Sequence, residues 1–131
     1  MSILGRRFST KLMATMAGVM LLVALLPAWS ITPKRDITLV VRGMAFYLES
    51  DLSTPNPTIE MKAGERVRVV IKNQDRGFTH DFAVPVLRAA TKQTDWNESG
   101  QVVFKAPKKP GTYEYVCQPH RLMMKGTIQV H

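Results

Sequence analysis

The sequence contains a single cysteine, Cys117, among its 131 residues. One cysteine excludes an internal disulfide, so the fold must be held together by its core alone. If the protein is exported, a free thiol is also open to oxidation. Taken alone, Cys117 has three possible roles: an inert buried side chain, a bridge to another chain, or a ligand.

The chain also lacks helical periodicity beyond its N-terminal part. No later segment repeats apolar residues with a period of 3.6 over three turns. Eight glycines and eight prolines are spread along the chain, which indicates many turns and short strands. The length allows one domain with a real core and hardly two.

A concentrated run of basic residues is missing as well. The formal net charge is +8, and removal of the first thirty residues leaves 15 basic and 10 acidic residues, a net charge of +5. The positive residues are scattered and often neighbour acids, unlike an arginine-rich arm. We therefore expect no nucleic-acid partner and a mildly basic surface.

The first thirty residues have the pattern of a bacterial secretory signal. Arg6 and Arg7 precede an apolar run without charge, residues 12–26, and Ala28 and Ser30 have the spacing that an export peptidase needs. As a helix this run covers about 22 Å, against about 30 Å of membrane hydrocarbon. We expect a cleaved signal at 1–30, with an uncleaved anchor as the alternative, and a domain at 31–131.

The rest of the chain alternates apolar and polar residues, as half-buried strands do. The clearest case is residues 66–72, where Val67, Val69 and Ile71 share one face. Turn residues recur about every ten positions, which predicts an all-β fold, an antiparallel β-sandwich with Greek-key connections. We expect strands at 36–42, 58–62, 66–72, 101–105, 112–117 and 126–130, extended segments at 43–48 and 78–84, and one helical turn near 87–90.

Potential metal ligands gather near the C-terminus. Cys117 and His120 lie three residues apart at the end of a predicted strand, Met123 and Met124 follow at once, and His80 lies near another strand end. Loops at one end of a sandwich would bring these side chains together. A thiolate, two imidazoles and a weak axial thioether suit copper, whereas a thioether is a poor ligand for zinc.

The residues from Gly111 to His120 resemble the Gly-x-Tyr-x-Tyr-x-Cys-x-Pro-His signature of the cupredoxins, the type 1 blue-copper proteins. The Cys-x-Pro-His loop is similar to that of plastocyanin and amicyanin, and Met124-Lys125-Gly126-Thr127 is similar to the azurin form. The pattern Asn-x-Asp-x-x-x-x-His, from Asn73 to His80, fits as well. The likeness covers residues 36–131.

The resemblance implies one copper ion held by His80, Cys117, His120 and Met124. It also implies one-electron transfer without substrate turnover. The N-terminal segment and the mildly basic charge lead us to expect an exported, periplasmic monomer that docks through a basic face on an acidic redox protein such as a cytochrome or oxidoreductase. A binuclear copper centre needs two bridging cysteines, so one chain cannot form it.

Several alternatives stay open. Met123 competes with Met124 for the axial position, and adjacent residues of an extended segment point to opposite sides. Asp81 is expected either to tie the ligand loops together or to face water. In place of an electron carrier, the chain is compatible with a copper-storage or copper-delivery protein, supported by the extra Met123 and by Met44 or Met61, which are expected to be exposed, or with a metal-free binding module.

Overall fold

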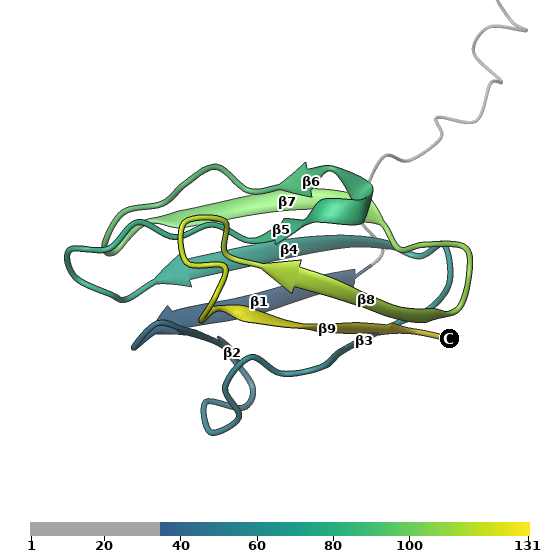
Figure 1. The fold of residues 1–131 in the computed structure, drawn as a ribbon, viewed down its shortest axis with the longest axis horizontal. Helices are drawn as coiled ribbons and strands as arrows, with labels where there is room; N and C mark the ends of the chain where they lie inside the picture. The colour runs from purple at the N-terminus through teal and green to yellow at the C-terminus, as the bar shows by residue number, and fades with distance from the viewer. Residues whose placement is uncertain (1–34) are drawn as a thin grey trace, which may run out of the picture. The chain divides into compact units, whose positions relative to one another are not determined.

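Two β-sheets enclose the hydrophobic core in the computed structural model, which describes residues 35–131 (Figure 1). The expected signal segment lies outside the described residues. One sheet has the order β2-β1-β4-β7, formed by β2 (Ala45–Leu48), β1 (Arg35–Arg42), β4 (Arg66–Asn73) and β7 (Ser99–Lys105). The other has the order β3-β9-β8-β5-β6, formed by β3 (Ile59–Met61), β9 (Lys125–Val130), β8 (Gly111–Val116), β5 (Ala83–Val84) and β6 (Ala89–Ala90).

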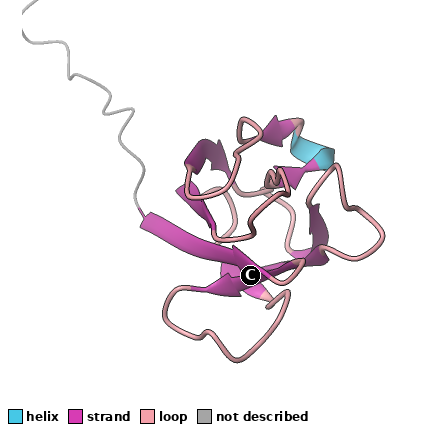
Figure 2. Ribbon diagram, turned by 90° about the vertical axis from the view of Figure 1, so that its left-hand side faces the viewer, coloured by secondary structure: helices cyan, strands magenta, loops and turns pink. Residues whose placement is uncertain are grey.

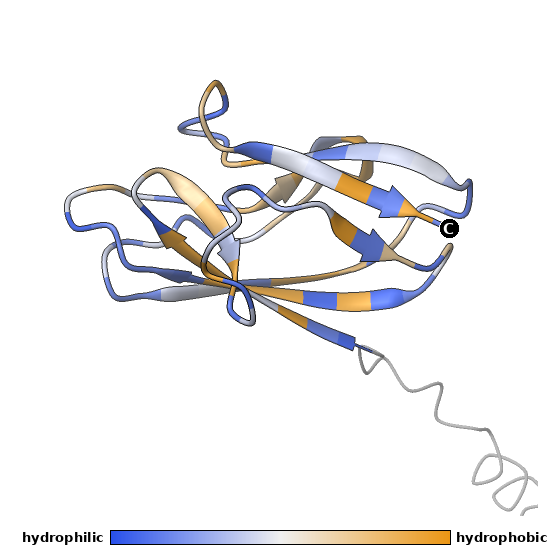
Figure 3. Ribbon diagram, turned by 90° about the horizontal axis from the view of Figure 1, so that it is seen from below, coloured by the Kyte–Doolittle hydropathy of each residue, from blue (hydrophilic) through white to orange (hydrophobic). Residues whose placement is uncertain are grey.

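The alternation read from the sequence places the core between the sheets. Val67, Val69 and Ile71 of β4 are fully buried, while the residues between them are half-buried or exposed. Figure 3 shows this alternation as changing hydropathy bands along the strands. Burial of a Val, Leu or Ile side chain stabilises the fold by about 1.5–3 kcal/mol, so these inward faces fix which side of each strand meets the core.

The predicted all-β sandwich is confirmed, with one difference in strand direction. β1 pairs with β4, and β3 with β9, in parallel; the other strand pairs are antiparallel. Alternation along a single strand is the same for both directions, so the sequence pattern carries no information about this choice.

Residues 78–84 form less strand than predicted. Only Ala83–Val84 belongs to a sheet, and His80 forms an isolated bridge with Thr94. The side-chain amide of Asn73 takes the place of hydrogen bonds from a neighbouring strand. Its Nδ2 donates to the backbone carbonyls of Phe78 (2.8 Å) and Thr94 (2.9 Å).

The expected helical turn lies slightly earlier than predicted. Among the described residues the helical element is one 3₁₀ turn, η1 (Pro85–Leu87), drawn in cyan in Figure 2. Arg88 follows it in a left-handed conformation with φ 51° and ends the turn. Within residues 35–131, no helix has the length and apolar character to cross a membrane.

An aromatic cluster of Phe46, Phe82 and Tyr115 fills the core beneath one end of the sandwich. The rings of Phe82 and Tyr115 stack with centroids 5.2 Å apart, and Phe46 meets both edge-on. The Tyr115 hydroxyl donates to the carbonyl of Pro57 at 2.7 Å. Phe82 and Tyr115 each lie two residues from a predicted ligand, so the cluster supports both ligand-bearing segments.

Gly126 leaves room for this cluster. A Cβ at Gly126 would lie 2.3 Å from the Tyr115 ring, closer than packed atoms approach. We predict that Gly126→Ala lowers the free energy of unfolding by about 1–3 kcal/mol, the usual cost of overpacking. Chemical denaturation measures this change. Ser99→Ala, at an exposed position of β7, is the control, with an expected change within about 0.5 kcal/mol; equal stabilities of the two variants would contradict the packing argument.

Candidate metal centre

The predicted ligands lie in loops at one end of the sandwich, the left end in Figure 1. β4 and β8 both end there: Cys117 directly follows β8, His120 lies in the turn after it, and His80 lies between β4 and β5. Cys117 and His80 are fully buried, and His120 is half-buried. The fold therefore brings together three side chains from two separate parts of the sequence.

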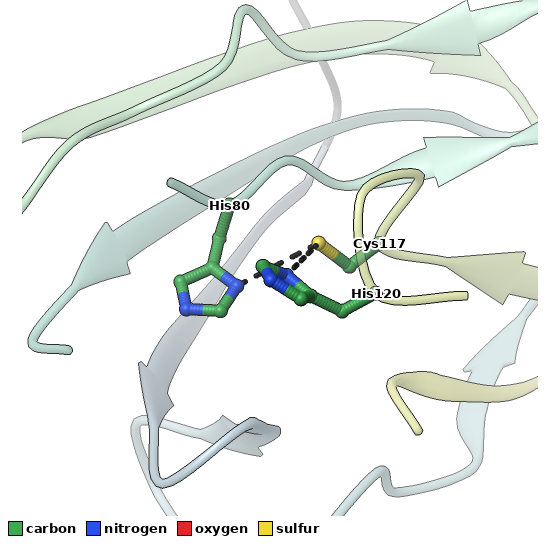
Figure 4. Close-up of side chains that lie close together, drawn as sticks. All are labelled: His80, Cys117 and His120. Atoms are coloured by element: carbon green, nitrogen blue, oxygen red, sulfur yellow. Dashed lines mark hydrogen bonds between the residues drawn. The ribbon is translucent and has the colours of Figure 1, made fainter. Parts of the chain in front are cut away.

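The three side chains converge on one point (Figure 4). The Sγ atom of Cys117 lies 3.6 Å from Nδ1 of His80 and 3.6 Å from Nδ1 of His120. One ligand atom from each of the three residues lies within 4.8 Å of the others. Both imidazoles thus present the same nitrogen, Nδ1, to the sulfur.

This spacing suits one shared metal ion. In tetrahedral zinc sites a sulfur ligand lies at about 2.3 Å and a nitrogen ligand at about 2.0–2.1 Å. Bonds of those lengths at angles near 110° put sulfur and nitrogen about 3.6 Å apart, the separation found between Cys117 and each histidine. The donor set of one thiolate sulfur and two imidazole nitrogens is the one that copper takes in electron-transfer sites.

Burial keeps Cys117 and His80 uncharged until a metal binds. It raises the pKa of the Cys117 thiol, since the thiolate loses solvation in the core. It also lowers the pKa of His80, and the neighbouring His120 lowers it further. His80 is therefore a neutral imidazole, ready to ligate, while binding at Cys117 must release the thiol proton.

Backbone hydrogen bonds close the loop that carries Cys117 and His120. The Cys117 N–H donates to the carbonyl of Met124 at 2.9 Å, and the His120 N–H donates to the carbonyl of Cys117 at 3.2 Å. The His120 carbonyl in turn accepts the N–H groups of Met123 (3.0 Å) and Met124 (2.9 Å). These bonds fix the spacing of the loop without help from a metal.

Hydrogen bonds between the main chain of His80 and Thr94 hold His80 in place. Its N–H donates to the carbonyl of Thr94 at 3.0 Å, and its carbonyl accepts from the N–H (2.8 Å) and the hydroxyl (3.0 Å) of Thr94. Both residues are fully buried. Nothing in the sequence singled out Thr94, because it lies in the least patterned stretch, residues 85–100.

The side of the His80 ring that faces away from Cys117 contacts the carboxylate of Asp75, which was not among the predicted site residues. Nε2 of His80 lies 3.1 Å from Oδ2 of Asp75. The available signal was the Asn-x-Asp-x-x-x-x-His pattern, in which Asp75 is the acidic position.

Asp81 ties the two ligand loops together, one of the two outcomes expected for it. It is buried, and its Oδ1 accepts the N–H of Gln118 at 2.7 Å. Burial raises the pKa of the Asp81 carboxyl, while the Gln118 N–H works in the opposite direction. The segment that carries His80 is thus joined to the segment that follows Cys117.

The methionines differ sharply in exposure. Met124 is fully buried within the hydrophobic core, whereas the side chain of Met123 is 62% exposed. Met44 is half-buried, and Met61, the last residue of β3, is buried in the core. Met61 is therefore not an exposed copper-handling residue, in contrast to the expectation from sequence.

A β-sandwich with one buried thiol and two imidazole nitrogens at its end defines a class of copper-binding electron-transfer proteins. Residues 17–130 match the model of the family described as "Cupredoxin-like domain". The chain belongs to this family. Members of the family are blue copper proteins that carry electrons and bind one type 1 copper ion.

The chain is also similar to individual proteins in sequence and in structure. The chain is 36% identical over 84 residues to the chloroplast plastocyanin of Physcomitrium patens; the match covers 55% of this chain and 46%, about half, of that relative. Rusticyanin from Thiobacillus ferrooxidans superimposes with a TM-score of 0.53 at 26% identity, over 76% of this chain and 79% of that one. Auracyanin B superimposes with a TM-score of 0.62 at 24% identity, over 76% and 91%, and this second likeness concerns the fold alone.

Proposed function

We propose that the protein is an exported electron carrier in which His80, Cys117, His120 and Met124 hold one copper ion. Copper bound by these ligands takes up and gives back a single electron, and no substrate is converted. The chain's own part is to hold the ligands in one arrangement, keep water away from Cys117 and His80, and leave part of His120 at the surface.

One observation carries this proposal. The buried Cys117 sulfur has two imidazole Nδ1 atoms at 3.6 Å, a set of soft and intermediate donors around a single point. A structural cysteine needs no such neighbours, and a zinc site would need a fourth strong ligand. Among the described residues no other group of three or more histidine, cysteine or acidic side chains has metal-binding spacing.

Copper titration of the purified protein tests the proposal. We expect one equivalent of Cu(II) to produce an intense thiolate-to-copper absorption band, and voltammetry to show a reversible one-electron wave. Cys117→Ser should remove the band because it removes the thiolate. A protein that takes up no copper, stays colourless and shows no voltammetric wave would refute the function and leave a metal-free β-sandwich as the better account.

Met124 is proposed as the axial ligand because its side chain is buried at the ligand end, whereas that of Met123 is 62% exposed. We predict that Met124→Leu, which nearly conserves volume, changes the optical and EPR spectra of the copper protein. The reason is that the weak axial ligand tunes a blue-copper site. Met123→Leu is the matched control and should leave both spectra unchanged; the reverse pattern would make Met123 the ligand.

Copper delivery is a second candidate, favoured by the exposed thioether of Met123 beside the loop that holds His120. The two functions differ in how firmly the ion is kept. A carrier retains copper through many redox cycles, whereas a delivery protein releases Cu(I) readily to a competing chelator. The measured rate of copper loss to such a chelator separates them.

The surface around the ligand loop suits docking to a redox partner. Leu122 is 93% exposed beside His120, and the guanidinium of Arg76 lies 4.4 Å from the centroid of the Trp96 ring. Arg121 is only loosely paired, 3.7 Å from Glu114. An apolar contact with basic residues around it fits a partner with an acidic face.

We predict that electron transfer to the physiological partner slows as salt is added. Exposed charges attract each other less as salt shortens the Debye length to about 10 Å at 0.1 M. Stopped-flow measurements over a range of salt concentrations test this. A rate that does not change with ionic strength would contradict electrostatic steering.

Export is proposed from residues 1–30 alone, with a mature domain at 31–131 that works as a periplasmic monomer. The basic start, the apolar run at 12–26 and the small residues Ala28 and Ser30 support a cleaved signal. The mass of the protein recovered from the periplasm tests this proposal. A full-length, membrane-bound product would indicate an uncleaved anchor.

A further inference from the structure

The carboxylate of Asp75 joins a ligand to a turn of the other sheet. Its Oδ1 accepts the N–H of Gly43 at 2.5 Å, and its Oδ2 accepts the N–H of Met44 at 3.0 Å and faces Nε2 of His80 at 3.1 Å. The Asp75 side chain is only 12% exposed. One partly buried carboxylate therefore connects the β1–β2 turn with the imidazole of His80.

The backbone around this carboxylate is shaped to receive it. Gly43 and Met44 both adopt left-handed conformations, with φ 57° and 61°, as in a two-residue hairpin turn that directs neighbouring N–H groups to one side. A left-handed conformation is unusual for a residue such as Met44. On the other side, the Asp75 N–H donates to Oδ1 of Asn73 at 2.8 Å. The position of the carboxylate is thus fixed from both directions.

This arrangement determines which nitrogen of His80 carries the proton. A carboxylate only accepts hydrogen bonds, and the other two groups that meet it are backbone donors. The ring must therefore place its N–H at Nε2, which leaves the lone pair of Nδ1 directed at Cys117, 3.6 Å away. A hydrogen bond of this kind orients a ligating imidazole and raises its basicity.

The negative charge of Asp75 also distinguishes the two oxidation states of copper. It attracts the doubly charged ion more strongly than the singly charged one, and burial limits the screening of that attraction. We propose that Asp75 is a positioning residue, which holds His80 in the Nε2–H tautomer and lowers the reduction potential of copper bound at Nδ1. The potential part of this inference rests on the proposed function.

Nuclear magnetic resonance of the copper-free protein tests the tautomer. Nitrogen-15 shifts of the His80 ring should show Nε2 protonated and Nδ1 unprotonated in the wild-type protein, and a loss of this preference in Asp75→Leu. A wild-type ring protonated at Nδ1 would overturn the inference. The measurement on the wild-type protein needs no copper, so it decides the tautomer whether or not the site functions as proposed, and the variant then tests whether Asp75 sets it.

Voltammetry of copper-loaded Asp75→Asn tests the effect of the charge. We expect the Cu(II) affinity to fall about 10–100-fold, the usual loss for such a partner of a ligand, and the Cu(I) affinity to fall less. Each tenfold difference between the two losses raises the potential by about 59 mV. An unchanged or lowered potential would overturn this part of the inference.

Asp36→Asn is the matched control because it removes the same charge from the far end of β1. The Asp36 carboxylate contacts Arg68 on β4, with Oδ1 3.0 Å from Nε, and the six residue steps from Asp36 to Arg42 span about 20 Å of strand. The potential of this variant should match that of the wild type. A rise equal to that of Asp75→Asn would show a general charge effect and contradict the local role.

Discussion

The metal centre depends on donors that are held together by the protein before any ion arrives. The closure of one short loop, in which the Cys117 N–H donates to the Met124 carbonyl at 2.9 Å, sets the distance between the two ends of the ligand segment. Inside it, the His120 carbonyl accepts two N–H groups and fixes the turn. Because these bonds lie in the backbone, they persist through changes of metal charge. Such a frame suits the proposed role as an electron carrier, in which the site accepts and releases electrons with little rearrangement.

The sandwich supplies what the loop alone cannot. The aromatic cluster of Phe46, Phe82 and Tyr115 packs beneath both ligand-bearing segments and excludes water from them. Parallel pairing of β1 with β4 makes both strands end at the ligand side, so that Asp75 meets the turn at 43–44 as well as His80. Asp81 and Gln118 connect the loops directly. His80 and Cys117 therefore occupy a dry, hydrogen-bonded setting, while Leu122 and part of His120 remain accessible.

Much of this organisation was predictable from the sequence. Alternating apolar residues such as Val67, Val69 and Ile71 predicted the strands, since burial of one face leaves a period of two. Cys117, His120 and His80 were identified as candidates because thiolate and imidazole are the donors that copper takes in electron-transfer sites, and the structure brings all three together. The direction of strand pairing was not predictable, because alternation is the same in parallel and antiparallel pairs.

The supporting contacts around the ligands were harder to foresee. Two hydrogen bonds from the Asn73 side chain take the place of bonds from a neighbouring strand. They form only because Phe78 and Thr94 lie close to Asn73 in the folded protein. Asp75 is the acidic position of the Asn-x-Asp-x-x-x-x-His pattern, but its hydrogen bond to His80 could not be predicted without the folded structure. Met124 was preferred over Met123 because of the resemblance at Met124 to Thr127, and the burial of Met124 supports that proposal, although adjacent positions in a sequence do not reveal burial.

The central claim is that the protein itself, rather than the metal, sets the ligand arrangement. Crystal structures of the copper-free and copper-loaded protein test it most directly. The account predicts the same rotamers of His80, Cys117 and His120 in both, with the Cys117–Met124, His80–Asp75 and Gln118–Asp81 hydrogen bonds intact. A copper-free structure in which either histidine has turned away, or the loop at 117–124 has rearranged, would contradict it.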